Sequence, residues 1–239
     1  MKFNLRIFKM IMLLLIVAGL YVFSGKRSNS KIVSGLKVEF SGSENLYLTH
    51  ESVDKLLIQN YGSLKNLAKE DLALNTIEMV IETNEMVKSA QVYLTIDGRL
   101  TSEIVQRRPI GRVEGITKFY VDDEGKRMPL SKYHSARVPI ITGEVTGKSL
   151  EDVFAILKYI NSDDFLHKNV IGMHVVDNDK YQLKFRMENF TVNLGSVDGL
   201  EAKFNNFKAF YAKANKDETL GKYNMVSLEF NNQVVCTKI

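Results

Sequence analysis

The chain has 239 residues, of which 45% are hydrophobic and 25% charged, and its formal net charge is +4 at pH 7. These proportions are typical of folded globular proteins and exclude a disordered, collagenous or multi-span membrane chain. The charge is too small and too evenly spread to indicate a nucleic-acid partner. Cys236 is the only cysteine, so the chain offers neither an intrachain disulfide nor a cysteine-based zinc site.

The N-terminus departs from this average composition. Three basic residues precede an uncharged apolar run over residues 10–23, and Lys26 and Arg27 follow it. The run is shorter than the roughly 20 residues of a full membrane span, but adjoining apolar residues lengthen it if Arg6 and Lys9 reach the headgroups. We expect a cytoplasmic tail (1–9), a transmembrane anchor (10–25) and a linker (26–34). A cleaved signal peptide is the alternative, although residues 22–25 lack a small-x-small cleavage site.

The residues after the linker predict a β-α-α-β-β unit. A strand over 36–40 precedes a helix capped by Thr49, and a second amphipathic helix, with Glu78 and Glu82 on its outer face, ends near Asn84. Alternating residues on both sides of Asp97-Gly98 then indicate a β-hairpin. Pro109 cannot donate to a strand ladder, so we expect it to close the unit.

The second half is richer in strands. Ser149 and Asp152 resemble a capping box for a helix that runs to Ile160, and an aromatic stripe predicts another helix from Leu200 to Tyr211. The strands are expected at residues 119–121, 127–130, 138–142, 181–187, 190–194, 225–230 and 233–237. The last of these is a candidate for an edge strand.

Two segments resemble a known signature. Residues 84–92 and 98–110, the latter ending in Gln-Arg-Arg-Pro-Ile, resemble the POTRA signature of the bacterial cell-division FtsQ (DivIB) family. Glu85 stands where the family has proline, Met86 where it often has an aromatic residue, and Gln106 where it has glutamate. Residues 120–125, 138–143, 192–195 and 226–230 are similar to later motifs of the family, so the resemblance extends from about residue 36 to residue 239.

The resemblance implies an α+β protein with a single N-terminal transmembrane helix. A β-α-α-β-β POTRA domain is expected over 35–113, and a mixed α/β domain with a mainly antiparallel sheet over 114–239. The family is also located in the cytoplasmic (inner) membrane, as single-pass proteins whose folded domains are extracytoplasmic and gather at the division septum. The same place is expected for this chain.

The sequence contains no recognisable catalytic, cofactor or metal motif. The four histidines are scattered, without zinc-site spacing. Ser52 and Lys55 match the Ser-x-x-Lys of penicillin-binding enzymes but lack its partner motifs. Asp122, Asp123 and Glu124 precede a glycine, as turn residues do. We therefore predict no enzyme, no cofactor, no metal and no small-molecule substrate. The basic residues around Arg107 and Arg108 fit either a solvated strand end or a site for lipid phosphates or an acidic partner.

Two classes of function remain in view. The first is an anchored interaction protein that adds partner strands to its sheets. For it the resemblance implies FtsB- and FtsL-like single-pass coiled-coil partners, other divisome proteins, and a role linking divisome assembly to septal peptidoglycan synthesis. The second is an anchored cell-wall enzyme using Ser52 and Lys55; a POTRA-bearing outer-membrane assembly factor is a third, weaker possibility.

The expected partner site is the end of the chain. Its last predicted strand contains no proline and lies where one side of a sheet is often unpaired. We expect Val235 to present its backbone amide at this edge. The alternative is that these residues only complete the sheet. By position in the family, the partner-binding residues are Phe230, Gln233, Val234, Val235, Cys236, Thr237 and Lys238.

Overall fold

The structure, a computed structural model, describes residues 5–29, 33–42, 45–62, 72–177, 179–230 and 233–239. The first element is the helix α1 (Leu5–Asn29). Among the described helices, none combines the length and the hydropathy that crossing a membrane requires. The chain divides into two compact units, Met1–Gln106 and Arg107–Ile239.

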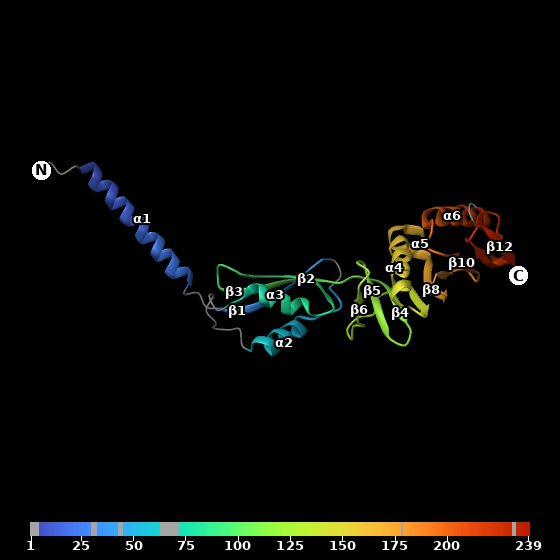
Figure 1. The fold of residues 1–239 in the computed structure, drawn as a ribbon, viewed down its shortest axis with the longest axis horizontal. Helices are drawn as coiled ribbons and strands as arrows, with labels where there is room; N and C mark the ends of the chain where they lie inside the picture. The colour runs from blue at the N-terminus through green and yellow to red at the C-terminus, as the bar shows by residue number, and fades with distance from the viewer. Residues whose placement is uncertain (1–4, 30–32, 43–44, 63–71, 178, 231–232) are drawn as a thin grey trace. The chain divides into compact units, whose positions relative to one another are not determined.

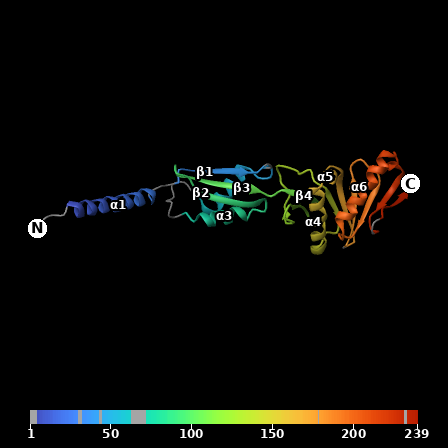
Figure 2. The same ribbon diagram turned by 90° about the horizontal axis from the view of Figure 1, so that it is seen from above.

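The first unit contains the predicted β-α-α-β-β order (Figure 1). Its three-stranded sheet has the order β1-β3-β2, with β1 parallel and β2 antiparallel to the central β3. Figure 2 shows the three strands side by side. The elements are β1 (Gly35–Ser41), α2 (His50–Tyr61), α3 (Leu74–Glu82), β2 (Val87–Leu94) and β3 (Arg99–Gln106).

Helix faces and a buried amide hold the first unit together. The amphipathic helices bury Leu57, Ile77 and Ile81, each at most 1% exposed, with Leu100 of β3 fully buried. The side-chain oxygen of Gln106 accepts hydrogen bonds from the amides of residues 47 and 48, at 2.9 and 3.1 Å. The glutamine that replaces the family glutamate therefore satisfies buried backbone donors, as the glutamate could.

The second unit is a nine-stranded sheet in the order β12-β11-β10-β9-β8-β7-β4-β5-β6. The pairs β4·β7, β7·β8 and β10·β11 are parallel and the other pairs antiparallel, so the sheet is mainly antiparallel as predicted. The strands are β4 (Pro109–Glu114), β5 (Lys118–Asp122), β6 (Arg127–Met128), β7 (Ile140–Gly143), β8 (Val170–Asp177), β9 (Lys180–Phe185), β10 (Thr191–Gly195), β11 (Tyr223–Ser227) and β12 (Val235–Lys238).

Helices α4 (Gly147–Ser162), α5 (Asp164–Asn169) and α6 (Leu200–Lys216) contribute with the sheet to one hydrophobic core, and a short 3-10 helix, η2 (Leu220–Lys222), precedes β11. Phe204 and Phe207 of the predicted aromatic stripe are fully buried in this core, and Leu200 and Tyr211 pack against it. Phe207 of α6 is fully buried, with its ring centroid 4.9 Å from that of Phe185 in β9. Tyr211 donates to a Glu188 carboxylate oxygen at 2.7 Å, and burial together with this bond raises the pKa of the phenol to about 12.

The structure corrects several sequence predictions. Pro109 does not close the first unit but begins β4, which pairs with β5 and β7, so the domain boundary lies before residue 107 rather than after 113. The capping box of α4 joins Thr146 to Ser149 and does not use Asp152. The strand expected over 225–230 ends at Ser227, and the strand expected over 233–237 begins only at Val235.

Candidate functional site at the edge strand β12

The strand β12 is the outermost strand of the nine-stranded sheet (red in Figure 1). It pairs antiparallel with β11, with Val235 opposite Ser227 and Thr237 opposite Met225. No strand in the described part of the chain pairs with its other side. The edge position predicted from the sequence is therefore confirmed.

The seven predicted site residues divide into two groups. Four of them, residues 235–238, form β12, whereas Phe230, Gln233 and Val234 precede the strand, and residues 231–232 lie outside the described residues. Phe230 is 54% exposed and Val235 is 42% exposed. Cys236 faces the opposite way and packs against the core, where burial raises the pKa of its thiol.

Two backbone hydrogen bonds fix which groups of β12 point out of the sheet. The Leu228 amide donates to the Asn193 carbonyl at 2.8 Å, which places this amide on the β10 side of its strand. The Ile239 amide donates to the Lys222 carbonyl at 3.1 Å, which places it on the β11 side. Successive residues of a strand direct their backbone groups to opposite sides in the plane of the sheet, so both bonds set the phase of the ladder.

Counting residues from either hydrogen bond gives the same direction for the backbone groups of each residue in β12. Val235 and Thr237 direct their amides and carbonyls to β11, and Cys236 and Lys238 direct theirs outward. The expectation that the Val235 amide lies at the open edge is therefore wrong. Side-chain alternation could not reveal this, because it reports the face of the sheet and not the direction within its plane.

A pocket of about 200 Å³ lies beside the residues that lead into β12. Phe230, Gln233 and Leu228 line it together with the first turns of α6, including Lys203. The Lys203 ammonium donates to the carbonyls of Leu194 and Ser196, at 3.1 and 2.7 Å, and burial lowers its pKa. Two of the predicted site residues therefore border a pocket whose lining also includes one basic and one acidic side chain, Lys203 and Asp198.

A family model described as FtsQ/DivIB, C-terminal related, matches residues 108–237. The chain belongs to the FtsQ/DivIB family. FtsQ/DivIB proteins are cell-division proteins, and the matched region covers the second unit through Thr237 of β12.

One solved structure similar to this FtsQ/DivIB chain is the major extracytoplasmic domain of the cell-division protein DivIB from Geobacillus stearothermophilus. The identity is 15% and the TM-score 0.34, over 47% of this chain and 97% of that one. The family assignment rests on the sequence match, because this TM-score is too low to support a comparison of folds. No curated protein matches the chain.

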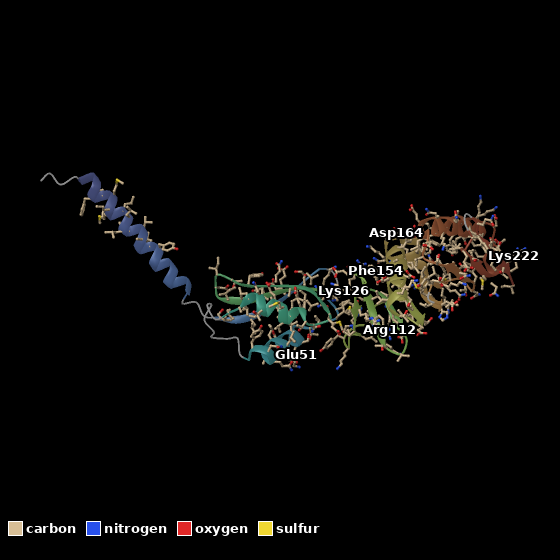
Figure 3. All side chains as sticks on the ribbon, viewed as in Figure 1. Glu51, Arg112, Lys126, Phe154, Asp164 and Lys222 are labelled. Carbon is tan, nitrogen blue, oxygen red and sulfur yellow. The ribbon has the colours of Figure 1, made fainter. Side chains whose placement is uncertain are left out.

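Except for the exposed Arg108, the basic residues at the start of the second unit of this FtsQ/DivIB chain are engaged within the unit. Arg107 donates to the buried Asp122 carboxylate at 2.7 Å. Arg112 pairs with Glu114 at 2.5 Å and Lys126 with Glu124 at 3.1 Å, and both basic residues are labelled in Figure 3. These pairs favour the interpretation of a structured strand end over a lipid or acidic-partner site.

The acidic turn and the Ser-x-x-Lys pair also have structural roles. One Asp122 oxygen accepts from the amides of Glu124 and Lys126, at 3.0 and 2.7 Å, which closes the turn between β5 and β6. Among the described residues, no group of three or more His, Cys, Asp or Glu could hold a metal ion. The Ser52 hydroxyl accepts from the Thr49 amide at 3.1 Å in the capping box of α2 and donates to the Thr49 carbonyl at 2.7 Å. Lys55 pairs with Glu51 at 2.8 Å.

Proposed function

We propose that this chain is a membrane-anchored, non-enzymatic scaffold of the divisome that binds FtsB- and FtsL-like single-pass proteins by strand addition to β12. Family membership supports a role in cell division. The observation that carries the mechanism is the open edge of β12, where Cys236 and Lys238 direct their backbone groups out of the sheet. An extended segment can add to such an edge through main-chain hydrogen bonds, and alternate side chains then give specificity.

The surroundings of the edge suit a protein ligand. Phe230, exposed and next to the pocket, offers an aromatic surface of the kind that anchors interfaces. The same pocket is lined by one basic and one acidic side chain, Lys203 and Asp198, so it offers a partner both charges. We infer that the partner follows its added strand with a segment that places an apolar side chain beside Phe230.

The membrane part of the proposal rests on α1. Its side chains from Met10 to Leu20 are largely apolar and exposed, including Leu14 at 66% and Leu15 at 68%. We propose that this helix anchors the chain in the cytoplasmic membrane, with both folded units outside and concentrated at the septum. Replacing Leu14 and Leu15 by Arg should cost roughly 5–7 kcal/mol of insertion free energy and release the protein on alkaline extraction. Full retention in the membrane pellet would exclude this anchor.

The alternation of inward and outward backbone amides along β12 allows a specific test of strand addition. Cys236→Pro removes an outward amide and leaves the ladder to β11 intact, since proline is tolerated on the open side of an edge strand. We expect it to abolish co-purification of a co-expressed FtsB-like protein. Cys236→Val keeps the amide and should bind as the wild type does.

Val235→Pro is the matched control for the direction of the backbone. It removes an inward amide and should loosen β12 from β11, visible as faster hydrogen exchange in Met225 and Ser227. If a folded Cys236→Pro protein retains its partner at wild-type affinity, the strand-addition mechanism is wrong and the interaction must use side chains elsewhere.

A further inference from the structure

The first unit has an edge strand of its own, β2, whose outward amides can be identified. The Thr95 amide donates across the hairpin to the Arg99 carbonyl at 2.9 Å, so Thr95 faces β3. By alternation, Gln91 and Tyr93 also face β3, whereas Ala90 and Val92 direct their amides away from the sheet. Unpaired amides in such a row invite another strand.

These two amides are not open, because α3 covers them. The Val92 amide donates to the Glu78 carboxylate at 2.7 Å, and the Ala90 amide donates to the Glu82 carboxylate at 3.0 Å. Glu78 and Glu82 are four residues apart, hence on one face of α3, which lies along β2 (Figures 1 and 2). Hydrogen bonds to an ionised acceptor are about twice as strong as neutral ones.

We propose that Glu78 and Glu82 close the β2 edge against pairing with a second copy of this chain. A β2·β2 contact would be antiparallel and isologous, and each copy would have to give up two charge-assisted hydrogen bonds to make it. It would also bring four carboxylates to one seam, which adds like-charge repulsion. The two glutamates therefore oppose self-association in two ways: they occupy the outward amide donors, and they repel the glutamates of a second copy. The other edge of this sheet is β1.

If both glutamates were only solvated and did not bind the amides of β2, their removal would leave the exchange of those amides unchanged. Hydrogen exchange of the detergent-solubilised full chain, resolved by residue, separates this case from the proposal. In Glu78→Ala/Glu82→Ala the amides of Ala90 and Val92 should exchange at least about tenfold faster, the equivalent of losing one charged hydrogen bond. The inward Gln91 amide serves as the internal control and should keep its protection. Unchanged exchange at Ala90 and Val92 would overturn the proposal.

A second pair of variants tests the acceptor itself. Glu78→Gln/Glu82→Gln keeps an oxygen acceptor at each position and removes the charge, so protection at Ala90 and Val92 should persist. Loss of protection in this variant, to the same extent as in the alanine variant, would show that the acceptor oxygens do not close the edge.

Self-association is the functional readout. Light scattering after size exclusion should show concentration-dependent dimers of the alanine variant and monomers of the glutamine variant. Glu51→Ala/Glu85→Ala makes the same change in net charge without removing the acceptors of the Ala90 and Val92 amides, and it should stay monomeric. In a Cys236→Ser background, Gln91→Cys should form an intermolecular disulfide only when Glu78 and Glu82 are alanine. Equal dimerisation of the Glu51/Glu85 variant, or no dimer of the Glu78/Glu82 alanine variant, would refute the proposal.

Discussion

Replacing Arg107 by Met should destabilise the second unit by about 3–5 kcal/mol, although the change is made at its first residue. The Asp122 side chain is fully buried, and the Arg107 side chain is only 14% exposed. Removing one partner of such a pair leaves a buried charge without its counter-ion, and this loss typically costs about 3–5 kcal/mol. The two turn amides that also bind Asp122 offset part of the loss, so we expect a value near the lower end of that range.

Arg108→Met is the matched control. Arg108 is exposed and forms no ion pair with a described residue, so its replacement should change stability by less than about 0.5 kcal/mol. Urea unfolding of the full chain gives both values when it is followed through hydrogen exchange of β9, which lies in the core of the second unit. Equal effects of the two substitutions would show that the Arg107–Asp122 pair does not stabilise the unit.

Three further outcomes can be measured in the same full-length protein. Ile77→Ala, at a residue 1% exposed, should cost about 2–5 kcal/mol, and Met79→Ala, 59% exposed on the same helix, should cost little; equal melting shifts would mean that the helix phase is wrong. Gly143→Ala should raise the rate of urea unfolding, because φ is +95° and an added Cβ would lie 2.2 Å from a carbonyl oxygen of β8; unchanged unfolding would contradict that contact. Asp163 caps α5. Burial opposes ionisation of its carboxyl, but hydrogen bonds from Lys208 and backbone amides outweigh burial and lower its pKa. Asp163→Ala should thus lower the melting temperature at pH 7. The deficit should shrink as the pH falls below about 4, because a carboxyl with a lowered pKa stabilises the folded state only while it is ionised. A deficit that is constant with pH would refute this.

Side-chain periodicity predicted the elements with a clear inner and outer face. The helix that contains Ile77, the hairpin around Asp97-Gly98 and the aromatic helix are all found as expected. α5 and β8 were not predicted, because α5 has only six residues and a register shift near Gly172 interrupts the alternation of β8. The signal that could have found α5 is Asp163, which ends α4 and caps the next helix.

The edge strand was predictable in position, but the direction of its backbone groups was not. The last predicted strand contains no proline and lies at the end of the chain, which suggested an edge strand, and β12 is an edge strand. The direction of the Cys236 amide depends on the ladder register, which no side-chain pattern contains. For the same reason Glu78 was predicted to lie only on an outer face. Its bond to the Val92 amide depends on how α3 lies along β2.

The order of strands in the second unit has a consequence for how its sheet is assembled. From β8 to β12, each strand lies beside the strand that precedes it in the chain. The antiparallel pairs close short connections, whereas β7·β8 and β10·β11 are parallel and are connected through helices. Because the entropic cost of closing a loop grows only slowly with its length, this part of the sheet can still grow in one direction. β12 is attached to β11 alone and is the last addition. A partner strand on its outer side would convert β12 from a terminal strand into an internal one, so that assembly of the complex would finish the folding of the sheet.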